Sequence, residues 1–266
     1  MNITVITDRE FFHEFDNIPV KLVDASTLDV NEFNEKSQMD KEYRNGFWES
    51  CSKRLFLIQK YMENNNVKNV IHLENDVLLY CEADELYGKI PDKSKMYVVV
   101  DSEVRGIPGI LYIPDHQVLG LMTYNYDWGK NDMENLYLAW RKFKEIKLFP
   151  IYHMGVNEFQ QKISESFCDF GCVFDGAAIG QYLGGIDIRN LDDLNKNTRG
   201  FVNETCVIDY SGHKFYWVYV SNNRHEPYIE MGGKLVKIMN LHIHSKKLHK
   251  FMSKHVSELM YIDFYD

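Results

Sequence analysis

The chain has 266 residues and a formal net charge of −9, from 39 acidic and 30 basic side chains. This acidic balance disfavours binding to a nucleic-acid polymer, which requires a basic surface, but it allows one nucleotide held by a metal or a few cations. The apolar fraction of 45% is ordinary for a globular protein, so a core can form without disulfide or metal cross-links.

The sequence carries no signal for a membrane span or for secretion. Its longest uninterrupted apolar run, Phe215 to Val220, is six residues, whereas a membrane-spanning helix requires about 20. The first residues lack the basic and apolar regions of a signal peptide. Five cysteines without a regular spacing favour reduced thiols. These features predict a cytoplasmic protein.

In the first half of the chain, strands are predicted to alternate with helices. Short apolar runs predict strands, and apolar residues that recur every three or four positions predict helices. The predicted strands span 2–6, 20–23, 67–73, 77–80, 96–100 and 109–113, and the predicted helices span 47–64, 116–124 and 132–145. Residues 24–45 are expected to form a loop with a helical turn.

The second half mixes strands with shorter helices. A helix is predicted from Asp175 to Leu183, ended by Gly184 and Gly185, and strands are predicted over 214–220 and 234–239. This order predicts an α/β fold, with a single domain over 1–266 and a mainly parallel central sheet flanked by helices. The sequence lacks four motifs: the glycine-rich dinucleotide loop, the NTPase phosphate loop, G-x-S-x-G and H-E-x-x-H. Their absence disfavours Rossmann dehydrogenases, phosphate-loop NTPases, α/β-hydrolases and zincins.

The first candidate site directly follows the predicted strand 67–73. There Glu74 and Asp76 flank Asn75. Ligands of open α/β sheets bind at the carboxyl ends of strands, and two carboxylates at that place suit Mg²⁺ or Mn²⁺ carrying a substrate phosphate. An acidic turn between two strands explains the same residues without a ligand.

The second candidate site lies near the C-terminus. His242 and His244 are predicted to share one face of a strand, opposite Leu241 and Ile243. Imidazole nitrogens bind divalent metals, and the ammonium group of Lys246 could meet a phosphate. Two exposed strand histidines are the alternative interpretation.

A third candidate is Asp175, at the start of the helix predicted over 175–183. Small residues follow it at 176–178 and allow close approach of a ligand or of another backbone segment. We expect Asp175 to be exposed at the N-terminus of this helix, where it caps the helix, contacts a ligand, or does both.

Two further segments could contribute to a binding site. Arg54 lies one helical period from Cys51 and Ile58, so it is expected to face inward, with either a pyrophosphate or an acidic side chain as its partner. Residues 105–108 are expected to form a glycine-containing loop that leads into the strand 109–113. Most such loops are turns without a ligand.

Taken in chain order, these elements resemble the nucleotide-sugar glycosyltransferases of the GT-A fold. The resemblance covers residues 1–251, and its most specific segments are HLENDVLLY (72–80), FDGAAIGQYLGG (174–185) and NLHIHSK (240–246). These segments are similar to uncharacterised glycosyltransferases, some of them from giant viruses. The resemblance implies one GT-A (Rossmann-like) domain, with a nucleotide-sugar half over about 1–115 and an acceptor half over about 116–251.

The resemblance also implies a metal site. In this family a D-x-D motif binds the metal that holds the donor diphosphate, and a C-terminal histidine often completes the metal shell. Asp76 matches the last Asp of that motif, and Glu74 takes the place of the first, where its longer side chain would act through water or reach the ribose. His242 or His244 matches the histidine, and we favour His244 because it is nearer to Lys246.

Other positions would contact the substrates. The resemblance implies that Thr7 and Asp8 cradle the nucleobase and that Asn75 contacts the ribose or the donor sugar. It implies that Arg54 lies near the diphosphate or the sugar and that Lys246 lies near the β-phosphate. It also implies that Gly106 to Gly109 line the donor sugar. Asp175 matches the acidic residue beside the donor sugar and acceptor. It is the candidate catalytic residue, which orients or deprotonates the acceptor hydroxyl.

These matches imply a metal-dependent glycosyltransferase of the hexosyltransferase type, with Mn²⁺ or Mg²⁺ as cofactor. The expected donor is a nucleoside-diphosphate sugar, with a UDP-sugar preferred, and the acceptor is a glycan, a protein or a small molecule. If the chain is viral, its location would be the host cytoplasm or the virion. One alternative is a nucleotidyltransferase, although the segment after Ile6 lacks the glycine-rich phosphate loop that this class needs. The other is a non-catalytic nucleotide- or sugar-binding relic, which Glu74 in place of Asp favours.

Overall fold

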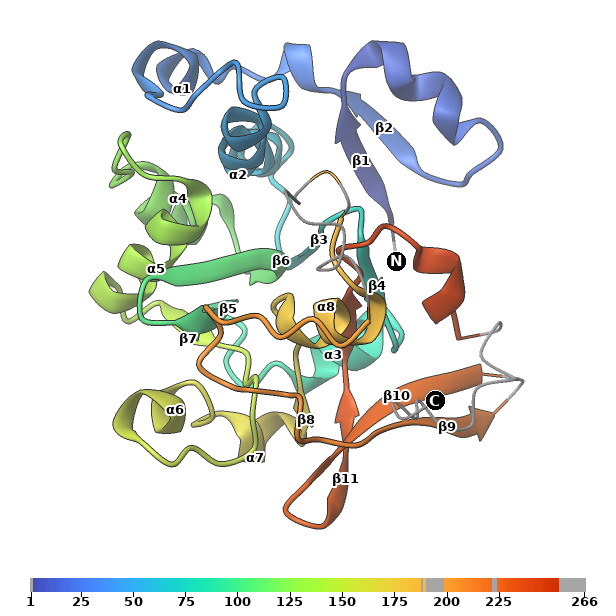
Figure 1. Ribbon diagram of the computed structural model, residues 1–266. Coiled ribbons are helices and arrows are strands. Elements are labelled where there is room, and N and C mark those ends of the chain that lie inside the picture. The colour runs from blue at the N-terminus through green and yellow to red at the C-terminus, as the bar shows by residue number, and fades with distance from the viewer. Residues whose placement is uncertain (1, 188, 190–198, 222–223, 254–266) are drawn as a thin grey trace.

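The computed structural model describes residues 2–187, 189, 199–221 and 224–253. Within these residues the chain folds into eight α-helices and twelve strands, which form four sheets (Figure 1). The fold is therefore mixed α/β. Among the described residues, no helix combines the length and the apolar character that crossing a membrane requires.

The central sheet has four strands in the order β3-β6-β5-β7. They are β3 (Val70–Leu73), β5 (Met96–Ser102), β6 (Arg105–Ile113) and β7 (Ile146–Leu148). Strand β6 runs antiparallel to both β3 and β5, and only the β5–β7 pair is parallel. The prediction of a mainly parallel central sheet is therefore wrong.

The antiparallel arrangement comes from a hairpin that the sequence pattern hides. Ser102 pairs with Arg105, so Glu103 and Val104 form a two-residue turn. Such turns usually contain Asn-Gly or Gly, and neither is present here. The segment 105–108, predicted as a loop, is instead the first half of β6. Pro108 is tolerated there because it precedes the residues that pair with β3 and lies at an irregularity in the β5–β6 register.

The remaining strands form three smaller sheets. A four-stranded sheet has the order β8-β11-β10-β9, a two-stranded sheet joins β12 to β4, and another joins β1 to β2. Their bounds are β1 (Thr4–Thr7), β2 (Lys21–Asp24), β4 (Val77–Leu79), β8 (Cys172–Val173), β9 (Phe215–Ser221), β10 (Arg224–Met231), β11 (Lys234–Ile238) and β12 (Asn240–His242). The β1–β2 and β8–β11 pairs are parallel, and the others are antiparallel.

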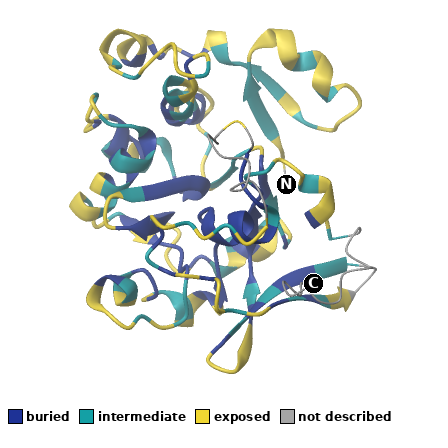
Figure 2. Cartoon of the chain, in the orientation of Figure 1, coloured by how far each residue is buried: buried dark blue, intermediate teal, exposed yellow. Residues whose placement is uncertain are grey.

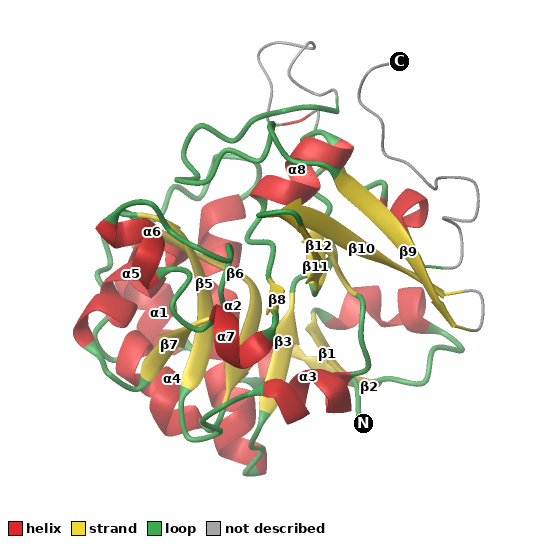
Figure 3. Ribbon diagram, turned by 90° about the horizontal axis from the view of Figure 1, so that it is seen from below, coloured by secondary structure: helices red, strands yellow, loops and turns green. Residues whose placement is uncertain are grey.

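The three longest helices pack against one another beside the central sheet. They are α2 (Phe47–Asn65), α4 (His116–Thr123) and α5 (Asp132–Lys142), and α5 also contacts β6 and β7. In Figure 3, α4 and α5 lie at the left and strands β9 and β10 at the right, with β3, β5 and β6 between them. The shorter helices are α1 (Asn31–Lys36), α3 (Ala83–Lys89), α6 (Glu158–Lys162), α7 (Phe167–Phe170) and α8 (Ala178–Gly184), with 3₁₀ turns η1 (Arg9–Phe15), η2 (Ala25–Thr27) and η5 (Leu248–Phe251).

Burial is concentrated in the centre of the molecule. Every residue of β5 is buried, as is every residue of β6 after Arg105, and α8 is buried from Ala178 to Leu183 (Figure 2). By contrast, no residue between 2 and 27 is buried. This segment contacts α2 through Tyr61, whose hydroxyl lies 3.4 Å from Thr4 Oγ1 and 3.2 Å from Lys21 Nζ. The division of the chain into two functional halves stays a prediction.

Helix α8 packs so closely on β12 that a glycine is required at the contact. A Cβ on Gly180 would lie 2.0 Å from the carbonyl oxygen of His242 and 2.6 Å from its carbonyl carbon. These are backbone atoms, so the clash cannot be relieved by moving a side chain. The sequence segment GAAIG is therefore explained here by the packing of one backbone on another.

We expect Gly180→Ala to lower the free energy of unfolding by about 1–3 kcal/mol, as overpacking does. Gly88→Ala is the matched control, because a Cβ at that position meets nothing within 4 Å. Since Gly88 lies within α3, alanine there should raise stability by up to about 1 kcal/mol. Denaturant unfolding of both variants tests the contact, and a Gly180→Ala protein as stable as the parent would contradict it.

Candidate metal centre

Strand pairing brings three side chains from distant parts of the chain together. The register of β4 with β12 pairs His242 with Val77, and the amide of Ile243 donates to the carbonyl of Asp76 over 2.8 Å. His242 therefore lies beside Asp76. On the other side, the amide of Glu74 donates to the carbonyl of Gly109 in β6 over 3.0 Å, which fixes the start of the Glu74–Asp76 turn.

The side chains of Glu74, Asp76 and His242 converge on one point. His242 Nε2 lies 3.3 Å from Glu74 Oε2 and 3.2 Å from Asp76 Oδ2. One potential ligand atom from each residue lies within 4.8 Å of the other two. Two carboxylate oxygens and one imidazole nitrogen are a donor set that a divalent cation such as Mn²⁺ or Mg²⁺ accepts. This group of residues could hold a metal ion, and it is called the carboxylate–histidine cluster below.

The ring of His242 is oriented by a hydrogen bond on its far side. Its Nδ1 lies 2.9 Å from the carbonyl oxygen of Gly176. A carbonyl oxygen can only accept, so Nδ1 carries a hydrogen and Nε2 is directed at the two carboxylates. Metal-binding histidines are oriented in this way by a hydrogen bond from the other ring nitrogen. Gly109 makes room for the ring, because a Cβ there would lie 2.9 Å from Nδ1.

Charge within the cluster shifts the pKa values of His242 and Asp76. Burial alone would lower the pKa of His242, but its hydrogen bond to Asp76 and the charges of Glu74 and Asp76 raise that pKa to about 9. Burial would raise the pKa of Asp76, but His242 and Lys246 hold it well below its usual range. In the protein without a metal, Asp76 is therefore ionised at neutral pH and faces His242 and Lys246.

Lys246 contacts Asp76 directly, with Nζ against Oδ2. Its backbone adopts the left-handed conformation, with φ of 61°, in the turn that follows β12. The sequence resemblance predicts a phosphate contact for Lys246. The structure brings its ammonium group to a carboxylate of the cluster.

Arg54 has two acidic partners. Its Nη2 lies 2.7 Å from Asp132 Oδ2, and its Nη1 contacts Glu74 Oε1. Of the two partners that the sequence leaves open, the acidic side chain is the one found. Burial would lower the pKa of Arg54, but the charges of Glu74 and Asp132 raise it. Glu74 is thus held from both sides, by Arg54 at Oε1 and by His242 at Oε2.

Asp132 is a member of this network that the sequence analysis missed. It is the first residue of α5, directly after the N-cap Asn131, and its side chain is 1% exposed. The sequence Asn131 to Glu134 has the pattern of a capping box, which signals a helix start but not an ionic partner for Arg54. Burial raises the pKa of Asp132, and the charge of Arg54 opposes that rise.

Asp175 is buried rather than exposed, in contrast to the prediction. It is 1% exposed, and its carboxylate accepts three backbone hydrogen bonds. Oδ1 accepts from Ile179 over 2.9 Å, and Oδ2 accepts from Gly180 over 2.7 Å and from His242 over 2.9 Å. The carboxylate therefore joins the start of α8 to the backbone of the histidine in the cluster. Burial raises the pKa of Asp175 to about 6, against the opposing effect of these hydrogen bonds.

Asn240 is the second residue that the sequence analysis missed. Its side-chain amide binds the backbone of Asp175 at both ends, accepting from the Asp175 amide over 3.2 Å and donating to the Asp175 carbonyl over 2.9 Å. Asn240 is fully buried, one residue before Leu241 and two before His242. It fixes the Asp175 segment against β12. Its position in NLHIHSK gives no sign of this role.

The other predicted site residues lie outside the cluster. His244 does not share the position of His242: their ring centres are 6.3 Å apart, and His244 Nδ1 accepts from the Asp187 amide over 3.3 Å. The geometry thus brings His242, not the favoured His244, to the carboxylates. Asn75 is exposed at the tip of the Glu74–Asp76 turn. Gly106 lies within β6 against Leu136. Thr7 is the last residue of β1, which pairs with β2, and Asp8 follows it.

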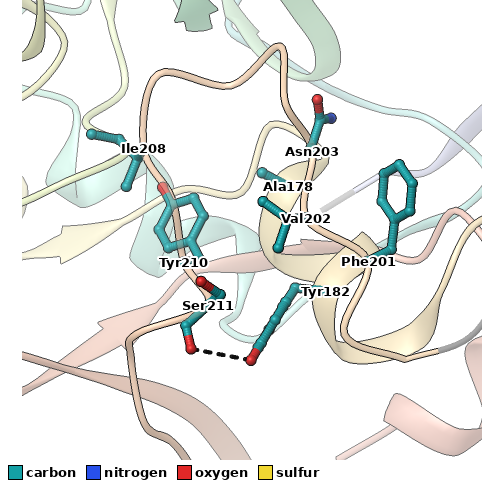
Figure 4. Close-up of a pocket in the computed structure, with 8 residues that line it drawn as sticks. All are labelled: Ala178, Tyr182, Phe201, Val202, Asn203, Ile208, Tyr210 and Ser211. Atoms are coloured by element: carbon teal, nitrogen blue, oxygen red, sulfur yellow. Dashed lines mark hydrogen bonds between the residues drawn. The ribbon is translucent and has the colours of Figure 1, made fainter.

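A narrow pocket lies beside α8, where that helix meets the segment 201–211 (Figure 4). The pocket is lined by Ala178, Tyr182, Phe201, Val202, Asn203, Ile208, Tyr210 and Ser211. Two of these residues are joined to each other, because the Tyr182 hydroxyl donates to the carbonyl of Ser211 over 3.2 Å. None of its lining residues belongs to the carboxylate–histidine cluster.

None of the protein-family models, curated proteins or solved structures compared with this chain matches it. Similarity therefore assigns no family. The resemblance to GT-A glycosyltransferases therefore depends on the sequence itself, on the order of its elements and most specifically on the segments 72–80, 174–185 and 240–246.

We expect Asp175→Asn to lower the free energy of unfolding by about 1–3 kcal/mol, because the new NH₂ group would face a backbone N–H where an oxygen now accepts. Asp115→Asn is the matched control. Asp115 caps α4 through a single oxygen, Oδ1, so asparagine can replace it at little cost. Denaturant unfolding measures both variants, and equal stability of the two would show that the three hydrogen bonds of Asp175 matter little.

Replacement of each histidine tests whether the cluster holds a metal ion and which histidine takes part. We expect His242→Ala to lose Mn²⁺ binding in isothermal titration calorimetry by at least about tenfold in affinity, since one of three protein ligands is removed. His244→Ala should retain the affinity of the parent within a small factor. The reverse result would assign the metal to His244 and overturn the geometry described above.

Proposed function

We propose that the chain is a metal-dependent glycosyltransferase, which moves a sugar from a nucleoside-diphosphate sugar to an acceptor hydroxyl. The carboxylate–histidine cluster is the observation that carries this proposal. Its residues come from two of the three segments that carry the resemblance to GT-A enzymes, 72–80 and 240–246, and strand pairing brings them together. The ring of His242 is also oriented as a ligand requires.

The residues of the cluster fit a divalent cation. Asp76 and His242 would bind it directly, and Glu74 would bind it through Oε2, since Arg54 contacts Oε1. We propose Mn²⁺ or Mg²⁺, which when bound supplies a Lewis acid for the negative charge of a leaving diphosphate. The imidazole ligand favours Mn²⁺ over Mg²⁺, because Mg²⁺ prefers oxygen ligands and retained waters.

The donor class follows from the charges around the cluster and from the resemblance. Lys246 carries the exposed positive charge beside Asp76, which suits the phosphate oxygens of a nucleoside diphosphate. A UDP-sugar is the proposed donor. Thr7 and Asp8, at the carboxyl end of β1, are the proposed contacts of the nucleobase, and Asn75 is the proposed contact of the ribose or donor sugar.

We assign Asp175 a positioning role in this reaction. Both of its carboxylate oxygens are already occupied by backbone amides, and the side chain is buried, so it is poorly placed to deprotonate an acceptor hydroxyl. Its hydrogen bond to the His242 amide instead holds the ligand strand in place. The group that orients the acceptor would then be another residue.

Donor turnover tests the proposal. The protein is incubated with Mn²⁺ and UDP-, GDP-, CDP- or dTDP-linked hexoses, with and without a panel of sugar acceptors, and free nucleoside diphosphate is measured by anion-exchange chromatography. We expect release from the UDP-sugar, abolished by EDTA. Asp76→Asn should lower the rate by at least about a hundredfold, because the leaving charge loses its main electrostatic partner.

Asp92→Asn is the matched control for Asp76→Asn. Asp92 is an exposed aspartate that accepts from Ser94, outside the cluster, so its replacement should leave the rate unchanged. Release that resists EDTA and Asp76→Asn would contradict the metal-dependent mechanism. Release of pyrophosphate from a nucleoside triphosphate and a sugar 1-phosphate would indicate a nucleotidyltransferase, and metal-dependent nucleotide binding without turnover would indicate a binding relic.

A further inference from the structure

Two basic side chains meet the same oxygen of Asp76. Lys246 Nζ contacts Oδ2, and His242 Nε2 lies 3.2 Å from it. A divalent cation in the cluster would need this carboxylate as a ligand. It would therefore take the place that the ammonium group of Lys246 occupies in the protein without a metal. Two cations bound to one carboxylate at such short range repel each other.

Lys246 is the member of the network that is free to move. Its side chain is 43% exposed, whereas that of Asp76 is 5% exposed and that of Arg54 is 24% exposed. Arg54 is also held by two carboxylates, Glu74 and Asp132. The backbone of Lys246 is fixed by a hydrogen bond from its amide to the carbonyl of Ile243 over 2.9 Å. The side chain can thus swing into solvent while the turn stays in place.

The balance of charge changes when a dication enters. Asp132 and Arg54 neutralise each other, so Glu74 and Asp76 leave two negative charges for the remaining cations. A dication would neutralise both of these carboxylates by itself, and His242 would bind it as a neutral imidazole after giving the proton on Nε2 to solvent. The ammonium group of Lys246 then has no carboxylate of the cluster left to neutralise, and it becomes a positive charge at the edge of the site.

We propose that Lys246 is an exchangeable counter-ion: a divalent metal displaces its ammonium group from Asp76, and the released group binds a phosphate of the incoming substrate. The second half of this statement rests on the function proposed above. The exchange makes metal and phosphate binding cooperative. Lys246 opposes binding of the metal alone, and it favours binding of a phosphate once the metal is present, which is a coupling free energy between the two ligands.

The variant Lys246→Gln should shift the two affinities in opposite directions. Isothermal titration with Mn²⁺ alone should show about tenfold tighter binding, because the competing ammonium group and its repulsion are gone. Titration with inorganic pyrophosphate at saturating Mn²⁺ should show about tenfold weaker binding, because a charge-assisted hydrogen bond is lost. A merely structural lysine would not produce changes of opposite sign.

Two control variants complete the experiment. Lys247→Gln removes the same charge from the next residue, which is also exposed, and should change neither affinity by more than about twofold. Lys246→Arg keeps the positive charge at Asp76, so Mn²⁺ alone should bind no more tightly than to the parent.

An affinity of Lys246→Gln for Mn²⁺ equal to or below that of the parent would overturn the exchange. Tighter Mn²⁺ binding with unchanged pyrophosphate binding would overturn the transfer of the ammonium group to phosphate. These results are distinct from failure of the proposed function. If the Mn²⁺ and pyrophosphate affinities of Lys246→Gln shift in opposite directions but no donor sugar releases nucleoside diphosphate, the exchange is supported and the glycosyltransferase function is contradicted. If nucleoside diphosphate is released but the two affinities do not shift, the glycosyltransferase function is supported and the exchange is contradicted.

Discussion

The buried carboxylate of Asp175 is the interaction on which the centre of the molecule depends. It accepts from amides of α8 and from the amide of His242, so one side chain joins a helix start to the last strand of the described structure. The side-chain amide of Asn240 also binds the backbone amide and carbonyl of Asp175. A buried carboxylate is costly unless it is hydrogen-bonded, and three amides meet that condition here. The pairing of β12 with β4 places His242 beside Asp76, and the hydrogen bonds of Asp175 hold α8 and the His242 backbone together at that place.

The glycines near His242 are required by the same arrangement. Gly180 allows α8 to touch the backbone of His242, and Gly109 leaves room for its ring, while the carbonyl of Gly176 orients that ring. The family resemblance assigns the segment 106–109 to the donor sugar. That assignment stays a prediction. The structure gives Gly109 and Gly180 a packing reason of their own, because side chains there would clash with His242.

The sequence predicted the local pieces better than their assembly. The amphipathic pattern of 47–64 and the apolar runs near Glu74 and His242 correspond to α2, β3, β4 and β12. The sheet direction was missed because the Glu103–Val104 turn has no turn residues and Pro108 suggested a loop. Carboxylates and histidines were found by residue type and spacing, but the choice of His242 depends on strand register. Asp132 contacts Arg54, which is 78 positions away in the sequence, and Asn240 contacts Asp175, which is 65 positions away. A local sequence pattern does not contain contacts over such separations.

The ionic network is ordered from the core to the solvent. Asp132 and Arg54 form its buried end, and a buried ion pair of this kind rarely adds net stability over apolar residues of similar size. Its value here is therefore geometric: Arg54 holds one oxygen of Glu74 and leaves the other facing His242. Lys246 forms the exposed end, where an ion pair is weak and easily exchanged. A site that is rigid on its inner side and exchangeable on its outer side keeps its ligands in place while the cation that neutralises them is replaced.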